Sequence, residues 1–385
     1  MATTKIVISL PDGTVYDVRI GGGLIPGLGQ HLQGIYPGKH VFVVTDSNVG
    51  PLYLPAVKES LSRGGYQVTD ITVPAGEASK SIPCATEVWE AMARAQFPRD
   101  GLVVALGGGV VGDLAGFVAS TYMRGVALVQ VPTSLLAMVD SSVGGKTGVN
   151  LDAGKNLVGT FKQPLYVCAD LDALETLPQG QWASGLAEIA KSAVIDSDEF
   201  FFWLSDAAPR LVGQDTACVG EAIARSVIFK ADVVALDAQE SKGIRECLNY
   251  GHTLGHAIEV CAGYGHFSHG QAVAEGMRFA ARLGVAVLGA SPDFVTAQDE
   301  LLDALGLPAL DWWAPPQDLL DAMGKDKKAR GGSIRFVLPR DVGDWELVEV
   351  DAGTLREHVE AWARSKETDA GRGPKQEAIA RAVKE

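Results

Sequence analysis

The chain has 385 residues and a formal net charge of −14, which disfavours a nucleic-acid partner because phosphate backbones attract basic faces. No apolar run reaches the ~18 residues that span a bilayer, and the N-terminal segment lacks the pattern of a signal peptide, so no membrane partner is expected. The five scattered cysteines form no Cys-x-x-Cys pair, which favours a cytoplasmic protein over a disulfide scaffold or a thiolate zinc site.

The first half of the chain alternates short apolar runs with glycine-punctuated turns, a pattern typical of α/β units. Strands are predicted at Val41–Thr45, Gln67–Val73, Gly101–Leu106 and Ala127–Val131, and a helix at Pro83–Ala95. Consecutive apolar strands suit a sheet that is covered on both faces. We therefore predict a Rossmann-like, NAD-binding α/β domain over residues 1–178.

From about Pro178 the apolar periodicity becomes helical. Helices are predicted at Gly180–Ile195, Asp215–Leu236, Asn249–Cys261, His269–Leu288 and Phe294–Leu305. One late strand pair is predicted at Ser333–Leu338 and Trp345–Val350. This pattern indicates a mainly α-helical metal- and substrate-binding domain over residues 179–365. Residues 366–385 are charged and poor in large apolar groups, so a flexible tail is expected there.

A glycine-rich segment, Gly107–Asp113 (GGGVVGD), lies between a predicted strand and a predicted helix. Its glycines satisfy G-x-G-x-x-G, so backbone amides and a helix N-terminus can approach a pyrophosphate. A tight turn without a ligand would use similar residues, and the motif alone leaves both interpretations open. Polar residues at other strand ends, where ligands of open α/β sheets bind, favour a nucleotide: Asp46, Glu77, Lys80, Thr133 and Ser134.

Histidines cluster in the second half, where four of the seven fall within eighteen residues. His252 and His256 are four apart and share a helix face, His269 opens the next predicted helix, and Glu188 lies on an earlier one. Two imidazoles and one carboxylate form a ligand set that leaves zinc an open position, and the spacing is not that of an HExxH protease. Single helical histidines often hydrogen-bond in a core instead, and His266 is interpreted in this way.

Cations also gather in glycine-rich or apolar contexts, namely Lys146, Lys155, Lys191 and Lys230. The G-x-x-x-x-G-K-[ST] spacing of a P-loop is absent. Arg245 and Asn249 are four apart, so a helix would place both on the side from which His252 projects. The run Lys325–Lys328 taken alone is typical of a solvated surface. Because a cation in an apolar context needs a partner, the cluster predicts an anionic small substrate.

Several long motifs occur in one order over roughly residues 40 to 340: GGGVVGDLAGFVASTYMRG, VPTSLLAMVDSSVGGKTGVN, GKNLVGTF, GLAEIAKSAVI, LNYGHTLGHAIE and HGQAVAEGM. Together they resemble 3-dehydroquinate synthase, of the sugar phosphate cyclase superfamily. The resemblance implies zinc or cobalt on Glu188, His252 and His269. It implies NAD bound by Asp46, Asn48, Glu77, Lys80, Gly108, Gly109, Val110, Asp113, Thr133, Ser134, Lys146, Lys155 and Thr176.

The same resemblance implies the substrate and catalytic residues Arg124, Asp140, Lys146, Asn156, Lys191, Lys230, Arg245, Asn249, His256 and Lys327. Arg124 is expected to reach the phosphate site of a neighbouring subunit, which implies a homodimer. Three positions depart from the family pattern. Ser134 replaces a threonine, Gln271 replaces a glutamate, and one extra residue separates Glu240 from Arg245, which leaves the role of Glu240 open.

The implied reaction is a phosphate-eliminating lyase step of the shikimate pathway, toward aromatic amino acids. It converts 3-deoxy-D-arabino-heptulosonate 7-phosphate to 3-dehydroquinate through transient oxidation by NAD, phosphate elimination, re-reduction and aldol closure. Another cyclase, a 2-deoxy-scyllo-inosose or aminodehydroquinate synthase, is the nearest alternative, but Arg245 and Lys230 favour a carboxylate-bearing substrate. A metal-dependent NAD polyol dehydrogenase would not need so many cations, and an inactive interaction protein would not need so complete a site.

Overall fold

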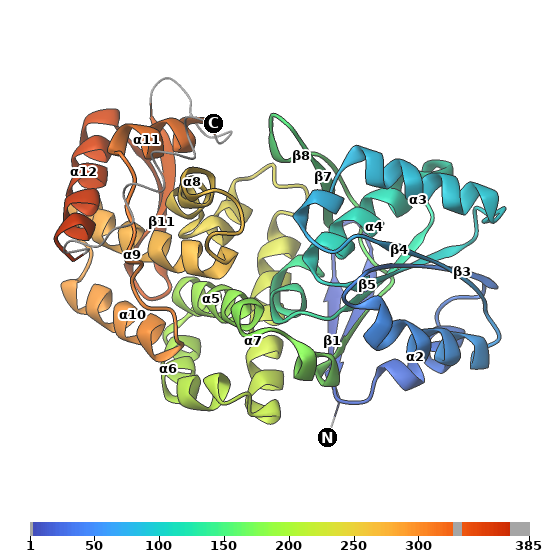
Figure 1. The fold of residues 1–385 in the computed structure, drawn as a ribbon. Helices are drawn as coiled ribbons and strands as arrows, with labels where there is room; N and C mark the ends of the chain where they lie inside the picture. Colours follow the sequence, from blue (N-terminus) through green and yellow to red (C-terminus); the bar gives the residue numbers. More distant parts are fainter. Residues whose placement is uncertain (1–2, 326–332, 370–385) are drawn as a thin grey trace. The chain divides into compact units, whose positions relative to one another are not determined.

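The computed structural model describes residues 3–325 and 333–369. It comprises two compact units, Met1–Arg245 and Glu246–Glu385 (Figure 1). The first unit therefore contains the α/β region together with the helices between residues 179 and 236. The expected domain boundary at residues 178 and 179 marks a change of secondary structure rather than this division into units, and it stays a prediction.

A seven-stranded sheet forms the centre of the first unit, in the order β1-β2-β9-β6-β5-β3-β4. The strands are β1 (Thr4–Ser9), β2 (Val15–Gly21), β3 (His40–Asp46), β4 (Gln67–Val73), β5 (Leu102–Gly107), β6 (Ala127–Pro132) and β9 (Tyr166–Asp170). Only β1 and β2 pair antiparallel, and every other neighbouring pair in this sheet is parallel. The four predicted strands are confirmed.

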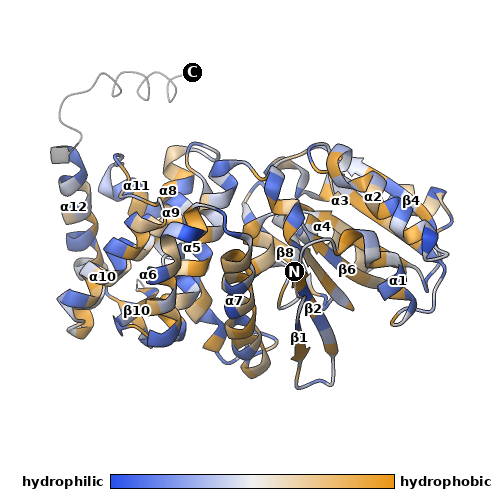
Figure 2. Cartoon of the chain, turned by 90° about the horizontal axis from the view of Figure 1, so that it is seen from below, coloured by the Kyte–Doolittle hydropathy of each residue, from blue (hydrophilic) through white to orange (hydrophobic). Residues whose placement is uncertain are grey.

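Alternate residues of the central strands face opposite layers of helices. Val41 and Val43 pack with α1 (Leu28–Gln33) and α2 (Gly50–Arg63), whereas Phe42 and Val44 pack with α3 (Ile82–Arg94) and α4 (Gly109–Thr121). Both faces of the sheet are therefore dry, which is why these strands are apolar throughout. Helix α4 is mostly hydrophobic along its length, in keeping with its buried position (Figure 2).

Several further elements complete the first unit. The turns are η1 (Ile25–Gly27), η2 (Glu77–Ser79), η3 (Tyr122–Arg124), η4 (Ala137–Ser141) and η5 (Leu171–Thr176). The hairpin is formed by β7 (Lys146–Leu151) and β8 (Gly154–Phe161), and the helices are α5 (Gln179–Asp196), α6 (Asp198–Val212) and α7 (Thr216–Leu236). Helices α5 and α7 agree with the sequence prediction, whereas the hairpin and α6 were not predicted.

The second unit is mainly helical. Its elements are α8 (His252–Ala262), α9 (His269–Leu288), α10 (Pro292–Ala304), α11 (Pro316–Lys325), β10 (Ile334–Asp341), β11 (Asp344–Val350) and α12 (Ala352–Asp369), and the 3-10 turn η6 (Ile244–Asn249) precedes α8. The predicted strand pair is confirmed as the antiparallel hairpin β10–β11. Helix α12 continues four residues past position 365, where the helical domain was expected to end.

Helices α8 and α9 approach each other closely because both carry glycine at their contact. A Cβ atom at Gly276 would lie 1.8 Å from the carbonyl oxygen of Gly251, and one at Gly255 would lie 3.0 Å from that of Ala272. Gly251 also has a φ of 78°, which side-chain-bearing residues rarely adopt. This close contact places the histidines of the two helices next to one another.

We expect the Gly276→Ala substitution to lower the free energy of unfolding by about 1–3 kcal/mol, because the added methyl group overpacks the helix contact. Gly324→Ala is the matched control, since Gly324 is an exposed helical glycine of α11 with open space around it. That substitution should be neutral or stabilise by up to about 1 kcal/mol. Thermal and urea unfolding of both variants measures the difference, and equal stability would contradict the overpacking argument.

Candidate active site

The carboxyl edge of the parallel sheet collects the polar residues expected to bind NAD. Asp46 ends β3, and its Oδ1 accepts hydrogen bonds from the backbone N–H groups of Asn48 (2.8 Å) and Val49 (2.9 Å). Thr133 and Ser134 follow β6 and are buried. Since the carboxyl ends of parallel strands share one edge, these residues lie where open α/β sheets bind ligands.

The glycine-rich loop follows β5 at this same edge. A Cβ atom at Gly107 would lie 2.7 Å from the side chain of Val111, and one at Gly108 would lie 3.3 Å from Ser134 Oγ. Close packing therefore disfavours a side chain at Gly107, whereas Gly108 would need only a small shift of Ser134, and neither glycine has a positive φ. Gly109 and Val110 form the first turn of α4, whose N-terminal N–H groups suit a phosphate.

A buried ion pair joins the loop that contains η2 to helix α4. Lys80 donates to the carboxylate of Asp113, and its residue exposure is only 6%. Burial raises the pKa of Asp113, and the positive charge of Lys80 opposes that rise. Asn150 links this loop to the hairpin, because its Nδ2 donates to Glu77 Oε1 (2.7 Å) and its backbone N–H donates to the Lys80 carbonyl (2.8 Å). Sequence reasoning did not single out Asn150, which the motif TGVN contains.

Two remaining NAD candidates lie on other elements of the first unit. Lys155 is on β8. Thr176 ends η5, where its hydroxyl lies 2.6 Å from the hydroxyl of Tyr53 on α2. Their roles toward a nucleotide stay predictions.

Asp140 and Lys230 form the centre of the expected anion site. Lys230 Nζ on α7 lies 2.8 Å from Asp140 Oδ1 and 2.6 Å from the Asp140 carbonyl oxygen. Burial would raise the pKa of Asp140, but the positive charges of Lys230 and Lys191 outweigh that effect and lower it to about 2. Lys191 also forms a buried ion pair with Glu188, three residues before it on α5. Asp140 is therefore ionised at neutral pH.

Lys146 and Asn156 flank this cluster on the hairpin. Lys146 Nζ lies 2.7 Å from Glu240 Oε1, a contact that gives Glu240 a partner although the extra residue follows it. Glu240 adopts a φ of 55°, so the loop around the insertion uses a left-handed turn. Asn156 has a φ of 57°, and its backbone N–H donates to Asn150 Oδ1 (2.9 Å).

Arg245 is buried, with an exposure of 1%, and burial lowers its pKa. Its guanidinium donates to the carbonyl oxygens of Ala238 (3.0 Å) and Gly144 (3.3 Å). A Cβ atom at Gly144 would lie 2.9 Å from Arg245 Nη2, so glycine is needed for this approach. The backbone carbonyls therefore orient the guanidinium.

The prediction that Arg245 and Asn249 lie on one face of a helix is wrong. Residues 244–249 form the 3-10 turn η6 rather than the start of an α-helix, and the left-handed Gly251 separates it from α8. Residues four apart in a 3-10 helix point about 120° away from each other. The helix predicted over Asn249–Cys261 thus begins on the last residue of η6, and its α-helical part begins only at His252.

Three imidazoles meet in the second unit. The ring centroids of His252 and His269 are 5.4 Å apart, and those of His252 and His256 are 5.3 Å apart. The Nδ1 atom of His252 lies 3.1 Å from the carbonyl oxygen of Tyr250. Because Nδ1 of His252 faces this carbonyl oxygen, its Nε2 lies on the opposite side of the ring, where it could bind a metal ion.

The surroundings explain two other sequence features. Ser268 caps α9 together with Gln271 in a capping box, so the glutamine that replaces the family glutamate has a structural role. The ring of His266 packs against Phe267 with a centroid distance of 4.6 Å. Arg124 is exposed on η3 with a φ of 66°, and Lys327 lies outside the described residues.

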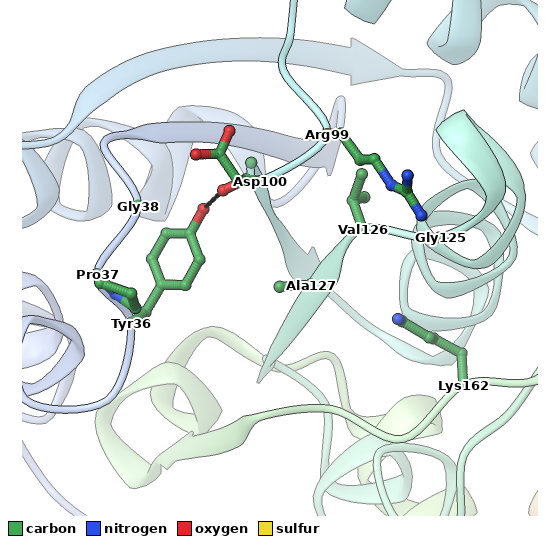
Figure 3. Close-up of a pocket in the computed structure, with 10 residues that line it drawn as sticks. Tyr36, Pro37, Gly38, Arg99, Asp100, Gly125, Val126, Ala127 and Lys162 are labelled. Carbon is green, nitrogen blue, oxygen red and sulfur yellow. Dashed lines mark hydrogen bonds between the residues drawn. The ribbon is translucent and has the colours of Figure 1, made fainter.

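A separate cavity of about 450 Å³ lies at the opposite, amino edge of the sheet (Figure 3). Arg99 and Lys162 lie on one side of it, and Tyr36, which donates to the Asp100 carbonyl, lies on the other. It contains none of the residues expected to bind NAD, metal or substrate. Among the described residues, no helix is long and apolar enough to cross a membrane.

Comparison with known proteins identifies the family. The model of the 3-dehydroquinate synthase N-terminal region matches residues 70–184, and that of its C-terminal region matches residues 185–329. The 3-dehydroquinate synthase of Rhodopirellula baltica is 44% identical, with 89% of this chain and 93% of the relative covered. The 3-dehydroquinate synthase of Methylococcus capsulatus is 45% identical, with 91% of this chain and 97% of the relative covered.

Solved structures with the same fold include other sugar phosphate cyclases. A 2-deoxy-scyllo-inosose synthase complexed with carbaglucose-6-phosphate, NAD+ and Co2+ has a TM-score of 0.84 and 26% identity, covering 93% of this chain and 99% of that one. A Streptomyces hygroscopicus 2-epi-5-epi-valiolone synthase with NAD+ and Zn2+ has a TM-score of 0.82 and 27% identity, covering 92% and 97%. Fold, family models and relatives thus agree that the chain belongs to the 3-dehydroquinate synthase family.

Proposed function

We propose that this chain converts 3-deoxy-D-arabino-heptulosonate 7-phosphate to 3-dehydroquinate and inorganic phosphate. The observation that carries the proposal is the sequence similarity to 3-dehydroquinate synthases, at 43–45% identity over most of the chain. The structural relatives that act on other sugar phosphates are 26–27% identical. The buried cations of the first unit suit a substrate that carries both a phosphate and a carboxylate.

The family uses NAD and a divalent metal ion, and the residues present fit both. Glu188, His252 and His269 would hold the metal ion, because two imidazoles and one carboxylate leave a divalent ion an open position for substrate. The carboxyl edge of the sheet would hold NAD. When bound, these groups supply reversible hydride transfer and polarisation of substrate oxygens.

The protein side chains bind the substrate and guide protons. We assign the phosphate to Lys146, Asn156, Lys191 and Lys327, and the carboxylate to Lys230, Arg245 and Asn249. His256 would move a proton near the phosphate, since an imidazole ring can both accept and donate a proton. Asp140, ionised beside Lys230, holds that ammonium group in place through a bond of 2.8 Å.

Arg124 is assigned to the phosphate site of a second copy of the chain, so the proposed enzyme is a homodimer. Its exposed position on η3 is compatible with contact to a neighbouring subunit. None of the five cysteines forms a disulfide bond in the described part of the chain, which supports a cytoplasmic location.

The substrate test uses the unmutated enzyme and Arg245→Lys. We expect kcat/KM for glucose 6-phosphate to be at least about tenfold below that for the heptulosonate phosphate, because loss of one charge-assisted carboxylate contact is worth about 1.5–3 kcal/mol. Arg245→Lys keeps the charge but loses the forked geometry, and should weaken use of the acid substrate about tenfold with NAD affinity unchanged. Phosphate release without net NADH accumulation is the readout. Equal use of the two substrates would favour a 2-deoxy-scyllo-inosose synthase.

The metal test compares His252→Ala with His266→Ala. We expect about one zinc ion per subunit in the unmutated protein and in His266→Ala, and loss of zinc in His252→Ala, because only His252 belongs to the proposed ligand set. Elemental analysis after dialysis measures the zinc content. Equal zinc loss in both variants would show that the ligands are misassigned.

The dimer test mixes two inactive variants, Arg124→Ala and Lys146→Ala. If Arg124 acts in the partner's site, each mixed dimer contains one intact site and one doubly defective site. After subunit exchange of equal amounts, about a quarter of the unmutated activity should return. Activity that stays at the level of the separate variants, despite exchange shown by native mass spectrometry, would place Arg124 in the site of its own subunit.

A further inference from the structure

Glu259 of α8 contacts His269 of α9, although Glu259 is not one of the proposed metal ligands. Glu259 Oε2 lies 3.3 Å from His269 Nδ1, and the Glu259 side chain is only 10% exposed. Glu259 comes seven residues after His252, which is about two helical turns, so the two side chains share one face of α8.

These contacts fix which nitrogen of each ring would face a metal ion. A backbone carbonyl oxygen accepts hydrogen bonds, and a carboxylate oxygen can do the same. Nδ1 of His252 faces the carbonyl oxygen of Tyr250 and Nδ1 of His269 faces the carboxylate of Glu259, so a proton on each Nδ1 would give both contacts a donor. Nε2 of each ring then presents its lone pair, as a metal ligand must.

We propose that Glu259 is a positioning residue for the metal centre, which selects the tautomer of His269 and holds its ring. This inference rests on the proposed metal ligands. A hydrogen-bonded carboxylate also raises the basicity of the opposite ring nitrogen, which strengthens its bond to a metal ion. The glycine contact between α8 and α9 brings the carboxylate within reach, because a larger residue at Gly255 would contact the Ala272 carbonyl at 3.0 Å.

A competing arrangement makes Glu259 a metal ligand itself. Ligand atoms of His256, Glu259 and His269 all lie within 4.8 Å of one another, so this trio could bind an ion. The two roles differ in the donor set, because a positioning residue leaves the atoms bound to the metal ion unchanged, whereas loss of a ligand removes an oxygen donor.

The experiment measures zinc affinity in metal-depleted full-length protein, by competition with a chromophoric chelator, for the unmutated chain, Glu259→Gln and Glu259→Leu. We expect affinity to fall about 10–100-fold in Glu259→Leu, the range typical for such partners, and less in Glu259→Gln, which keeps an acceptor oxygen. Glu275→Gln is the control, since Glu275 is a buried carboxylate of the same helix as His269 that binds Trp362 and Lys366 instead. Its zinc affinity should not change.

Cobalt-loaded samples separate the two roles. The visible absorption bands of Co2+ should keep their positions in both Glu259 variants if Glu259 only positions His269. Zinc affinity within twofold of the unmutated protein in Glu259→Leu, or altered cobalt bands in Glu259→Gln, would overturn the inference. Circular dichroism of the metal-free proteins verifies folding, and Glu259→Gln carries the test if Glu259→Leu does not fold. Because no substrate is used, failure of the proposed reaction would be seen separately, in the substrate assay.

Discussion

Burial of paired charges is the constraint on which the first unit depends. Three pairs have a buried lysine, namely Lys80–Asp113, Lys191–Glu188 and Lys230–Asp140. Moving an ammonium group out of water costs several kcal/mol, and a partner of opposite charge offsets only part of that cost. These pairs therefore do not explain why the unit folds, and the apolar layers on both faces of the sheet must supply its stability. They instead hold the ammonium groups of these lysines in fixed orientations.

Much of the sheet could be predicted because its strands are buried on both faces and therefore read as continuous apolar runs. The hairpin β7–β8 was missed for the opposite reason, since its strands contain glycine and polar residues and do not read as continuous apolar runs. Lys146 and Glu240 are 94 residues apart, and no local pattern shows that contact. Asn150 was missed in the same way, because its hydrogen bonds to Glu77 and Lys80 join segments that only the fold brings together.

In the second unit, periodicity identified the helices but not their contacts. Helix α12 was not predicted, because its sequence is rich in charge. Its anchor is Glu275 on α9, which accepts a hydrogen bond from Trp362 Nε1 (2.7 Å) and pairs with Lys366 (2.8 Å). The sequence assigned Lys366 to a flexible tail, since a lysine at a helix end looks solvated until its buried partner is known. The histidine spacing on α8, by contrast, predicted the ring contact directly because it is local.

The fixed orientation of the Arg245 side chain bears on the choice of substrate. Polyol dehydrogenases with this fold are only 14–15% identical, so the shared architecture does not select a substrate. In the proposed function, selection depends on side chains such as Arg245, whose guanidinium donates to two backbone carbonyl oxygens. An arginine fixed in this way loses little conformational freedom when it meets a carboxylate, so more of the contact energy appears as affinity. The inserted residue after Glu240 leaves this geometry possible, because the loop absorbs it in a left-handed turn at Glu240 while Arg245 remains anchored to Gly144.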